Sequence, residues 1–416
     1  MADDLTGAGL VFTDPKAYAD EPRWHAAASL LREQDPVHLV EAPGFLPFYA
    51  VTLHEHVCEV ERENEIFHNT LQSVLIPKIE ADGQTQSGIE LKTLIHMDGQ
   101  DHRATRAITN EWFKPMQLRR RMEERIGTLA REYVDRMLAL GGRCDFARDI
   151  ALYYPLHVIM GILGLPEEDE AKMLKLTQQL FGNEDPEFAG ENRGEAIIGA
   201  MIEFAGYFDK ITQDRREHPG PDLASTIANG MIQGEPLGPL ETASYYTIVA
   251  TAGHDTTSSS LATGLQKLME HPEQIRFLQE DPSRIPNAVD EIIRWSSPVR
   301  HFLRYATEDY ELGGVAIRKG ERLLLSYLSA NRDASVFEDP FRFDVTRSNA
   351  GEHVAFGLGV HYCLGAHLAR MELIAFFEEL LSRIESIEPD GEVENTLATF
   401  VGGPKRLPVR FRARAS

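Results

Sequence analysis

Cysteine is scarce in this sequence: among 416 residues, only Cys58, Cys144 and Cys363 occur. Three scattered thiols cannot form a disulfide framework, which excludes a small disulfide-stabilised fold. A chain of this length buries enough apolar surface to be stable without cross-links. The cysteine content therefore favours a reducing, cytoplasmic setting.

Long apolar runs and an excess of basic residues are also lacking. The most apolar stretch, residues 151–165, is too short to span a bilayer and contains His157. The N-terminus, Met1-Ala2-Asp3-Asp4, is acidic, whereas a secretion signal would begin with basic residues. With 42 Lys and Arg against 65 Asp and Glu, the net charge is -23, and such a protein repels phosphate backbones. The sequence predicts neither a membrane nor a nucleic-acid partner.

Hydrophobic periodicity predicts a mainly α protein with small β-sheets, of the α+β class, in one domain over residues 1–416. Helices are expected over residues 22–34, 53–63, 100–113, 116–140, 148–163, 167–181, 191–217, 285–295 and 364–384. Short strands are expected over residues 37–40, 48–52, 299–305 and 322–328. Residues 69–99 form a long irregular segment, and a loop of this length inside a domain is usually functional.

Residues 239–269 read as one unusually long helix, with Gly253-His254-Asp255-Thr256-Thr257-Ser258 in its middle. Glycine, aspartate and threonine are poor residues for a helix interior, and such local conflicts point to function or strain. Asp255 and Thr256 could alternatively cap a new helix. The helical periodicity that continues on both sides argues against that alternative.

The segment Phe356–Gly365 carries the strongest chemical signal. Cys363 lies at the start of the last predicted helix, where free backbone N–H groups and the helix dipole favour a thiolate. Glycines at 357, 359 and 365 allow a tight turn beside a flat ligand. Taken alone, the pattern is also that of an ordinary buried thiol. A zinc site made of His361, Cys363 and His367 would lack a fourth ligand.

Four ordered motifs together resemble the cytochromes P450, and the resemblance covers essentially the whole chain. Residues 353–365 resemble the family's haem-thiolate loop, through Phe356, Gly359, His361, Cys363 and Gly365. The remaining motifs are Glu291-x-x-Arg294, the segment 252–257, and His102-x-x-x-Arg106. The resemblance implies the cytochrome P450 fold and haem b (iron protoporphyrin IX), with Cys363 as the iron ligand.

The resemblance also implies roles for individual residues. Asp255 and Thr256 would deliver protons to bound dioxygen, Gly253 would leave room for that oxygen, and His254 would be a bystander. Contacts to the haem propionates would come from His102, Arg106, Arg304 and His361. Glu291, Arg294 and Arg347 would form a structural network, although a pair spaced i, i+3 is more often a solvated ion pair. The long helix of residues 239–269 would then be the oxygen-activating helix.

At subfamily level, residues 151–160, 251–260 and 400–405 resemble the α-terpineol hydroxylases. This resemblance implies a monooxygenase that hydroxylates a small apolar terpenoid or alkyl-aromatic substrate, with steroid side chains as the alternative. Residues 69–99 would be the substrate-access loop. The pocket would be lined by the loop 71–94 and by Ile248, Ala252, Val299, Phe302, Phe400 and Val401, with core packing as the alternative for each.

No flavin or iron–sulfur module is recognisable, and Gly357-x-Gly359 is not a dinucleotide-binding fingerprint. By the resemblance, electrons would come from a ferredoxin and its NAD(P)H-dependent reductase. The ferredoxin would dock on a basic patch formed by Lys114, Arg119, Arg120, Arg121 and Arg370. Two rival functions remain: a peroxide-using haem-thiolate enzyme, and a haem sensor or carrier without catalysis.

Overall fold

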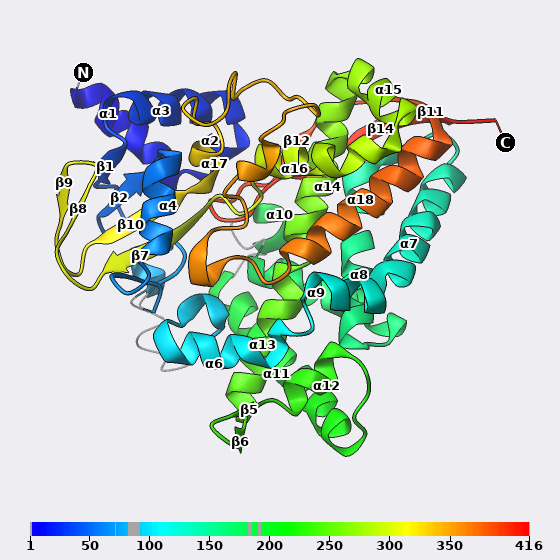
Figure 1. The fold of residues 1–416 in the computed structure, drawn as a ribbon, viewed down its shortest axis with the longest axis horizontal. Helices are drawn as coiled ribbons and strands as arrows, with labels where there is room; N and C mark the ends of the chain where they lie inside the picture. Colours follow the sequence, from blue (N-terminus) through cyan, green and yellow to red (C-terminus); the bar gives the residue numbers. More distant parts are fainter. Residues whose placement is uncertain (1, 71, 82–91, 182–184, 190–192, 416) are drawn as a thin grey trace.

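The computed structural model describes residues 2–70, 72–81, 92–181, 185–189 and 193–415. It is mainly helical with small sheets, as the sequence predicts. Figure 1 shows the two parts of the architecture, with most helices on one side and the largest sheet on the other.

The sheet side is built from the N-terminal residues and from the chain around residue 310. Its helices are α1 (Ala2–Gly9), α2 (Pro15–Ala19), α3 (Glu21–Gln34), α4 (His54–Arg62) and α17 (Tyr327–Ala330). The five-stranded sheet has the order β1 (Val37–Val40), β2 (Phe48–Val51), β10 (Arg322–Ser326), β7 (His301–Ala306) and β3 (Phe67–His68). β10 pairs antiparallel with β7 and parallel with β2. A hairpin of β8 (Tyr310–Leu312) and β9 (Val315–Ile317) extends from it.

The helical side carries the largest hydrophobic core. Its helices are α6 (Gly99–Asn110), α7 (Pro115–Ala139), α8 (Tyr154–Leu163), α9 (Glu170–Phe181), α10 (Pro186–Ala189), α11 (Arg193–Glu217), α12 (Leu223–Ala228), α13 (Pro239–Ala252), α14 (Asp255–Glu270), α15 (Pro272–Glu280), α16 (Ile285–Ser296) and α18 (Ala366–Arg383). The small sheets here are β4 (Arg143–Asp145) with β11 (Ile384–Pro389) and β14 (Pro408–Ala413), β5 (Met231–Ile232) with β6 (Glu235–Pro236), and β12 (Glu394–Asn395) with β13 (Pro404–Arg406).

Two predicted helices are divided in the structure. The helix expected over residues 148–163 begins as a π-helical turn, Ala147–Ala151, and α8 starts only at Tyr154. Pro155 explains the break, because proline lacks an N–H and is tolerated only in the first helical turn. The helix expected over 239–269 ends at Ala252 and resumes at Asp255.

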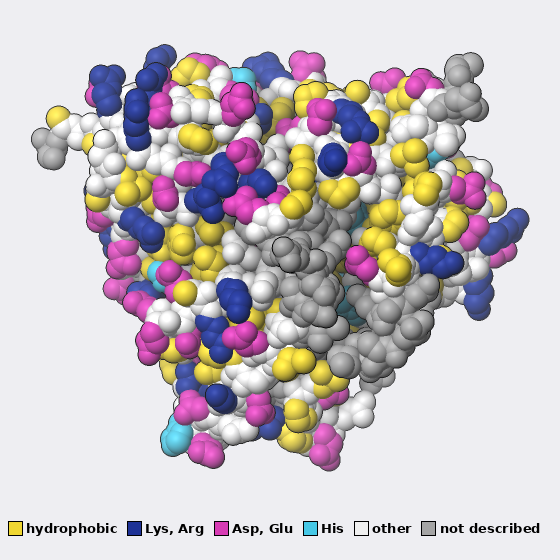
Figure 2. Space-filling view, turned by 180° about the vertical axis from the view of Figure 1, so that it is seen from behind, with side chains coloured by type: hydrophobic (Ala, Val, Ile, Leu, Met, Phe, Trp, Pro, Cys, Tyr) yellow, Lys and Arg dark blue, Asp and Glu magenta, His cyan; other side chains and the backbone are white. Residues whose placement is uncertain are grey.

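Other elements were not predicted, among them α1, α2, α12, α15 and the hairpins β5–β6 and β8–β9. The strand expected over residues 322–328 ends at Ser326, because the Ser326 hydroxyl accepts the Ser329 N–H and caps α17. Among the described residues, no helix is both long and apolar enough to cross a membrane. On the face opposite that of Figure 1, acidic and basic side chains are mixed rather than separated (Figure 2).

Candidate functional site

Cys363 lies in a tight loop between a 3-10 turn, Gly359–His361, and the start of α18. Its N–H donates to the Phe356 carbonyl at 2.9 Å. Gly359 has a φ of 69°, and a Cβ there would lie 2.6 Å from the carbonyl oxygen of Glu61. Only glycine therefore fits at 359, because both the backbone conformation and the contact with α4 exclude a side chain.

Solvent can reach the Cys363 side chain, although many protein atoms lie around its sulfur. Burial raises the pKa of the Cys363 thiol, and the Gly365 N–H and the Arg106 guanidinium oppose that shift. Burial also raises the pKa of Cys58, and that of Cys144 to about 12, but no backbone N–H opposes the shift at either residue. An accessible sulfur with N–H donors and flanking glycines fits a thiolate ligand to a flat metal cofactor.

Three of the four predicted propionate contacts lie together beside this loop. The His102 and His361 rings are 4.2 Å apart, and Arg106 donates to the Tyr362 carbonyl at 2.7 Å. His361 Nε2 lies 3.6 Å from the Asp98 carboxylate. Burial, followed by the charges of His361 and Arg106, lowers the pKa of His102 to about 4, so its ring is neutral at pH 7. The cluster presents donors suited to carboxylates.

Arg304, the fourth predicted contact, is fully buried and pairs with the Glu61 carboxylate at 2.8 Å. Tyr327 also donates its hydroxyl to Glu61. Burial lowers the pKa of Arg304, but the Glu61 charge, with a smaller contribution from Asp98, outweighs it and raises that pKa. Sequence analysis missed Glu61, although a glutamate on the apolar face of α4 with Val57 and Val60 is a signal for a buried ion pair.

Thr256 lies in the first turn of α14, just after the break in the predicted long helix. Its hydroxyl donates to the Ala252 carbonyl at 2.8 Å, so its oxygen is left to accept a hydrogen bond. A Cβ on Gly253 would lie 2.6 Å from Ile159 Cδ1. Packing against α8 therefore requires glycine here, and the room for oxygen stays a prediction.

The sequence predicted that His254 would be a bystander, but in the structure both of its ring nitrogens have partners. Its side chain is fully buried, its Nε2 lies 2.7 Å from the Leu152 carbonyl, and its Nδ1 lies 3.2 Å from the Asp255 carboxylate. Burial raises the pKa of Asp255, and the His254 charge opposes that shift. The two residues at the break thus form one unit, with His254 buried and Asp255 partly exposed.

Glu291, Arg294 and Arg347 lie together in the interior. Arg294 donates two bonds to the Glu291 carboxylate, at 2.7 and 2.8 Å, and Arg347 Nε lies 3.2 Å from it. The Asp344 N–H donates to the same carboxylate at 2.9 Å. The pair is therefore no solvated surface ion pair, and it connects α16 to the segment that precedes the Cys363 loop.

The predicted pocket residues fall into two groups. Val299 forms an isolated bridge with Val401, and the Phe302 and Phe400 rings are 5.4 Å apart. Ile248 and Ala252 lie one turn apart on α13, with Ala252 exposed. Of the predicted access loop 69–99, Leu71 and residues 82–91 lie outside the described residues.

Two sequence-based alternatives find no support. The described part of the chain contains no group of three or more His, Cys, Asp or Glu side chains arranged to hold a metal, so the zinc site is absent from it. Arg370 is not a free member of a basic patch: it pairs with Asp290 at 2.7 Å and lies over the Phe356 ring.

Comparisons with known proteins agree with this geometry. The cytochrome P450 family model matches residues 62–411. The chain is 40% identical to cytochrome P450-terp of a Pseudomonas species, over 95% of each protein. It is 32% identical to a steroid C26-monooxygenase of Mycobacterium bovis, over 98% of this chain and 93% of that protein. It is also 32% identical to linalool 8-monooxygenase of Pseudomonas putida, over 92% of this chain and 95% of that protein.

Among solved structures, CYP108D1 from Novosphingobium aromaticivorans superposes with a TM-score of 0.92 at 39% identity, covering 98% of this chain and 99% of that one. A family model that spans most of the chain, relatives of nearly equal length and a shared fold all agree with the loop around Cys363. The chain belongs to the cytochrome P450 family and is a haem-thiolate monooxygenase.

Proposed function

We propose that this monooxygenase hydroxylates a small apolar substrate, a terpenoid or an alkyl-aromatic compound, with dioxygen and electrons from a ferredoxin. The main support is its similarity to cytochrome P450-terp and to a linalool monooxygenase. The partly exposed aromatic pair Phe302 and Phe400 adds an apolar surface that an apolar substrate could contact.

Cys363 would hold the haem iron through its sulfur, and Arg106, His102 and His361 would bind the propionates, as would Arg304. When bound, the haem supplies dioxygen activation, which electron donation from the thiolate assists. The Gly365 N–H directed at the sulfur would keep the thiolate in place and moderate its basicity.

Residues at the start of α14 would deliver the protons that the reaction needs. Thr256, with its proton committed to Ala252, would accept a hydrogen bond and hold a water in place. Asp255, kept from ionising easily by its burial, would donate a proton to that water. A peroxide-using enzyme would not need this pair, so product formation with peroxide but none with ferredoxin and reductase would contradict the proposal.

Steroid side-chain hydroxylation is the second candidate, because a relative of nearly full length is a steroid C26-monooxygenase. A binding screen that follows the Soret band distinguishes the two. Terpenoids and alkyl-aromatics should shift the band at micromolar concentration, whereas sterols should not. Turnover of the tightest ligand excludes a haem sensor or carrier.

A further inference from the structure

The imidazole of His254 is held between two groups that accept hydrogen bonds. Its Nε2 lies 2.7 Å from the Leu152 carbonyl, which can only accept, so Nε2 carries a proton. This contact links the break between α13 and α14 to the residues just before α8. A histidine buried so completely, with a committed ring nitrogen, has a fixed orientation.

The other ring nitrogen, Nδ1, lies 3.2 Å from Asp255 Oδ1 and 3.4 Å from Thr177 Oγ1 on α9. The Thr177 hydroxyl donates to the Leu174 carbonyl at 2.9 Å, a shorter contact, and so offers no proton to Nδ1. The proton between Nδ1 and Oδ1 must then belong to the pair. Either an imidazolium faces a carboxylate, or a carboxylic acid donates to a neutral imidazole.

We infer that His254 and Asp255 share one proton in the resting enzyme, and that His254 is a positioning residue that keeps Asp255 oriented and loaded for proton delivery. The inference rests on the proposed role of Asp255. In delivery, the pair loses its proton to a water held by Thr256, which leaves a neutral imidazole and a carboxylate. A proton from solvent then restores the pair.

The surroundings of Asp255 support a shared proton at neutral pH. Its side chain is 21% exposed, and burial is the main influence that raises its pKa. Among the described residues, His254 is the other group that shifts the pKa of Asp255. The groups that face His254 from α9 and from the segment before α8, Thr177 and the Leu152 carbonyl, carry no charge.

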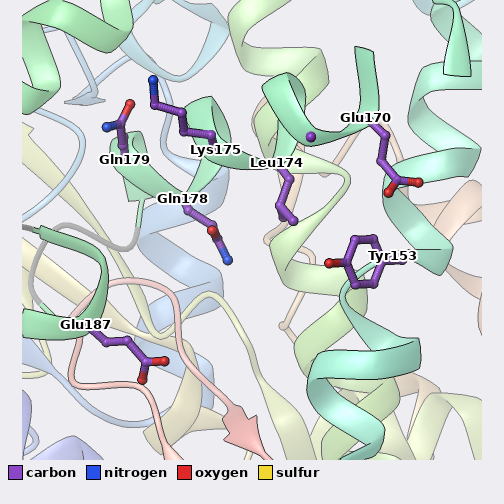
Figure 3. Close-up of a pocket in the computed structure, with 8 residues that line it drawn as sticks. Tyr153, Glu170, Leu174, Lys175, Gln178, Gln179 and Glu187 are labelled. Carbon is purple, nitrogen blue, oxygen red and sulfur yellow. The ribbon is translucent and has the colours of Figure 1, made fainter. Parts of the chain in front are cut away.

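A pocket of about 350 Å³ lies beside the two segments that hold His254. Figure 3 shows Leu174 and Gln178 of α9 on one side and Tyr153 across from them. Tyr153 follows Leu152 in the chain, and Leu174 and Gln178 flank Thr177. A pocket of this size holds several waters. In this proposal, those waters are the source of the proton that restores the pair.

Infrared difference spectroscopy of the ferric holoenzyme between pH 6 and pH 10 tests the shared proton, with Asp255→Asn as the reference. Either of two results supports it. The first is the C=O band of a protonated Asp255 that shifts in His254→Asn. The second is a carboxylate band of Asp255 together with imidazolium bands that disappear in His254→Asn. In both cases one proton must be lost above pH 7. An ionised Asp255 beside a neutral imidazole at pH 7 would overturn the inference.

Turnover measurements then test the positioning role. His254→Asn should lower the rate of product formation per electron pair about 10²-fold, the lower end for acid–base groups, and raise the solvent isotope effect. His218→Asn, a change to an exposed histidine, should alter neither quantity. A slower His254→Asn enzyme with an unchanged isotope effect would indicate a merely structural histidine and contradict the role.

The two proposals fail separately, because the infrared measurement needs no turnover. Normal coupling in Asp255→Asn would refute the role of Asp255 in delivery and leave the resting proton standing. Leu174→Trp, which fills the pocket, should raise the isotope effect without changing the infrared bands. If Leu174→Trp leaves the isotope effect unchanged, protons reach the pair by another route.

Discussion

Cys363 differs from the other two cysteines in access and in its N–H neighbours rather than in thiol acidity. We expect Cys363→His to bind haem and to lose the red-shifted carbon monoxide band of thiolate-ligated haem, because imidazole donates less charge to the iron. Reduced difference spectra measure this band. Cys58→Ala and Cys144→Ala serve as controls and should keep it. A band that survives in Cys363→His would show that another residue is the ligand.

Thr256 acts through a single oxygen atom. Thr256→Ala should keep substrate affinity but divert much of the NAD(P)H consumption to peroxide or water, because the hydrogen-bond acceptor beside Asp255 is lost. The ratio of product to NAD(P)H measures this coupling. Thr256→Ser keeps the hydroxyl and should stay far closer to the wild type. Equal coupling in the alanine and serine variants would remove Thr256 from proton delivery.

At the level of elements, the Glu291–Arg294–Arg347 network connects α16 to the approach to the Cys363 loop. Arg294→Leu should destabilise the holoenzyme by about 3–5 kcal/mol, because a buried carboxylate loses its principal partner. Urea unfolding measures the change. Arg318→Leu, which removes an exposed pair with Asp309, should leave the midpoint nearly unchanged. A loss for Arg294→Leu as small as that of Arg318→Leu would contradict a structural role.

A change at Phe400 tests whether the aromatic pair of Phe302 and Phe400 lines the substrate pocket. Phe400→Ala removes one ring of the pair with Phe302 and enlarges the proposed pocket. Product analysis should show altered regiochemistry or acceptance of a larger substrate. Val409→Ala, a truncation in the buried core, should lower stability without changing the products. Unchanged products with reduced stability for Phe400→Ala would place Phe400 in the core.

The helices and strands with clear periodicity were predictable, and so were the residues of the Cys363 loop, because each depends on local spacing. The partners of buried charges were not, since Glu61 meets Arg304 across 243 positions. The contacts of His254 were unpredictable for the same reason, because its partner Leu152 lies in the turn before α8 and its partner Thr177 lies on α9. The break at residues 253–254 was visible as poor helix formers, but the close approach of Ile159 that excludes a side chain at Gly253 is tertiary.

On the scale of the whole molecule, a net charge of -23 coexists with a basic patch, which we now restrict to Lys114, Arg119, Arg120 and Arg121. All four are exposed, and Lys114 also pairs with Glu111 at the surface. Burial, followed by the charges of Arg370 and Arg119, lowers the pKa of His367 at the start of α18. Figure 1 shows the start of α7 beside α18. The patch therefore lies on the Cys363 side, where an acidic ferredoxin would be steered to it.

The double variant Lys114→Glu with Arg119→Glu tests this docking surface. Arg121 is left unchanged because it also packs over Trp112 and its loss would disturb the fold. Stopped-flow reduction by ferredoxin at low salt should slow and lose its salt dependence, while the carbon monoxide spectrum and substrate affinity stay the same. Arg318→Glu, a charge reversal just after β9 and far from the patch, should change neither the reduction rate nor its salt dependence. Wild-type reduction rates in the double variant would place the docking site elsewhere.

The contact between Gly359 and Glu61 has a consequence for protein engineering. The backbone of Gly359 packs closely against the Glu61 carbonyl oxygen, and the Glu61 carboxylate binds Arg304 and Tyr327. The last turn of α4 therefore positions both the Cys363 loop and the Arg304 side chain. The ten residues around Cys363 are therefore not a portable module. A graft of residues 356–365 onto another scaffold would keep the sequence of the motif but lose its shape unless the last turn of α4 were transferred with it.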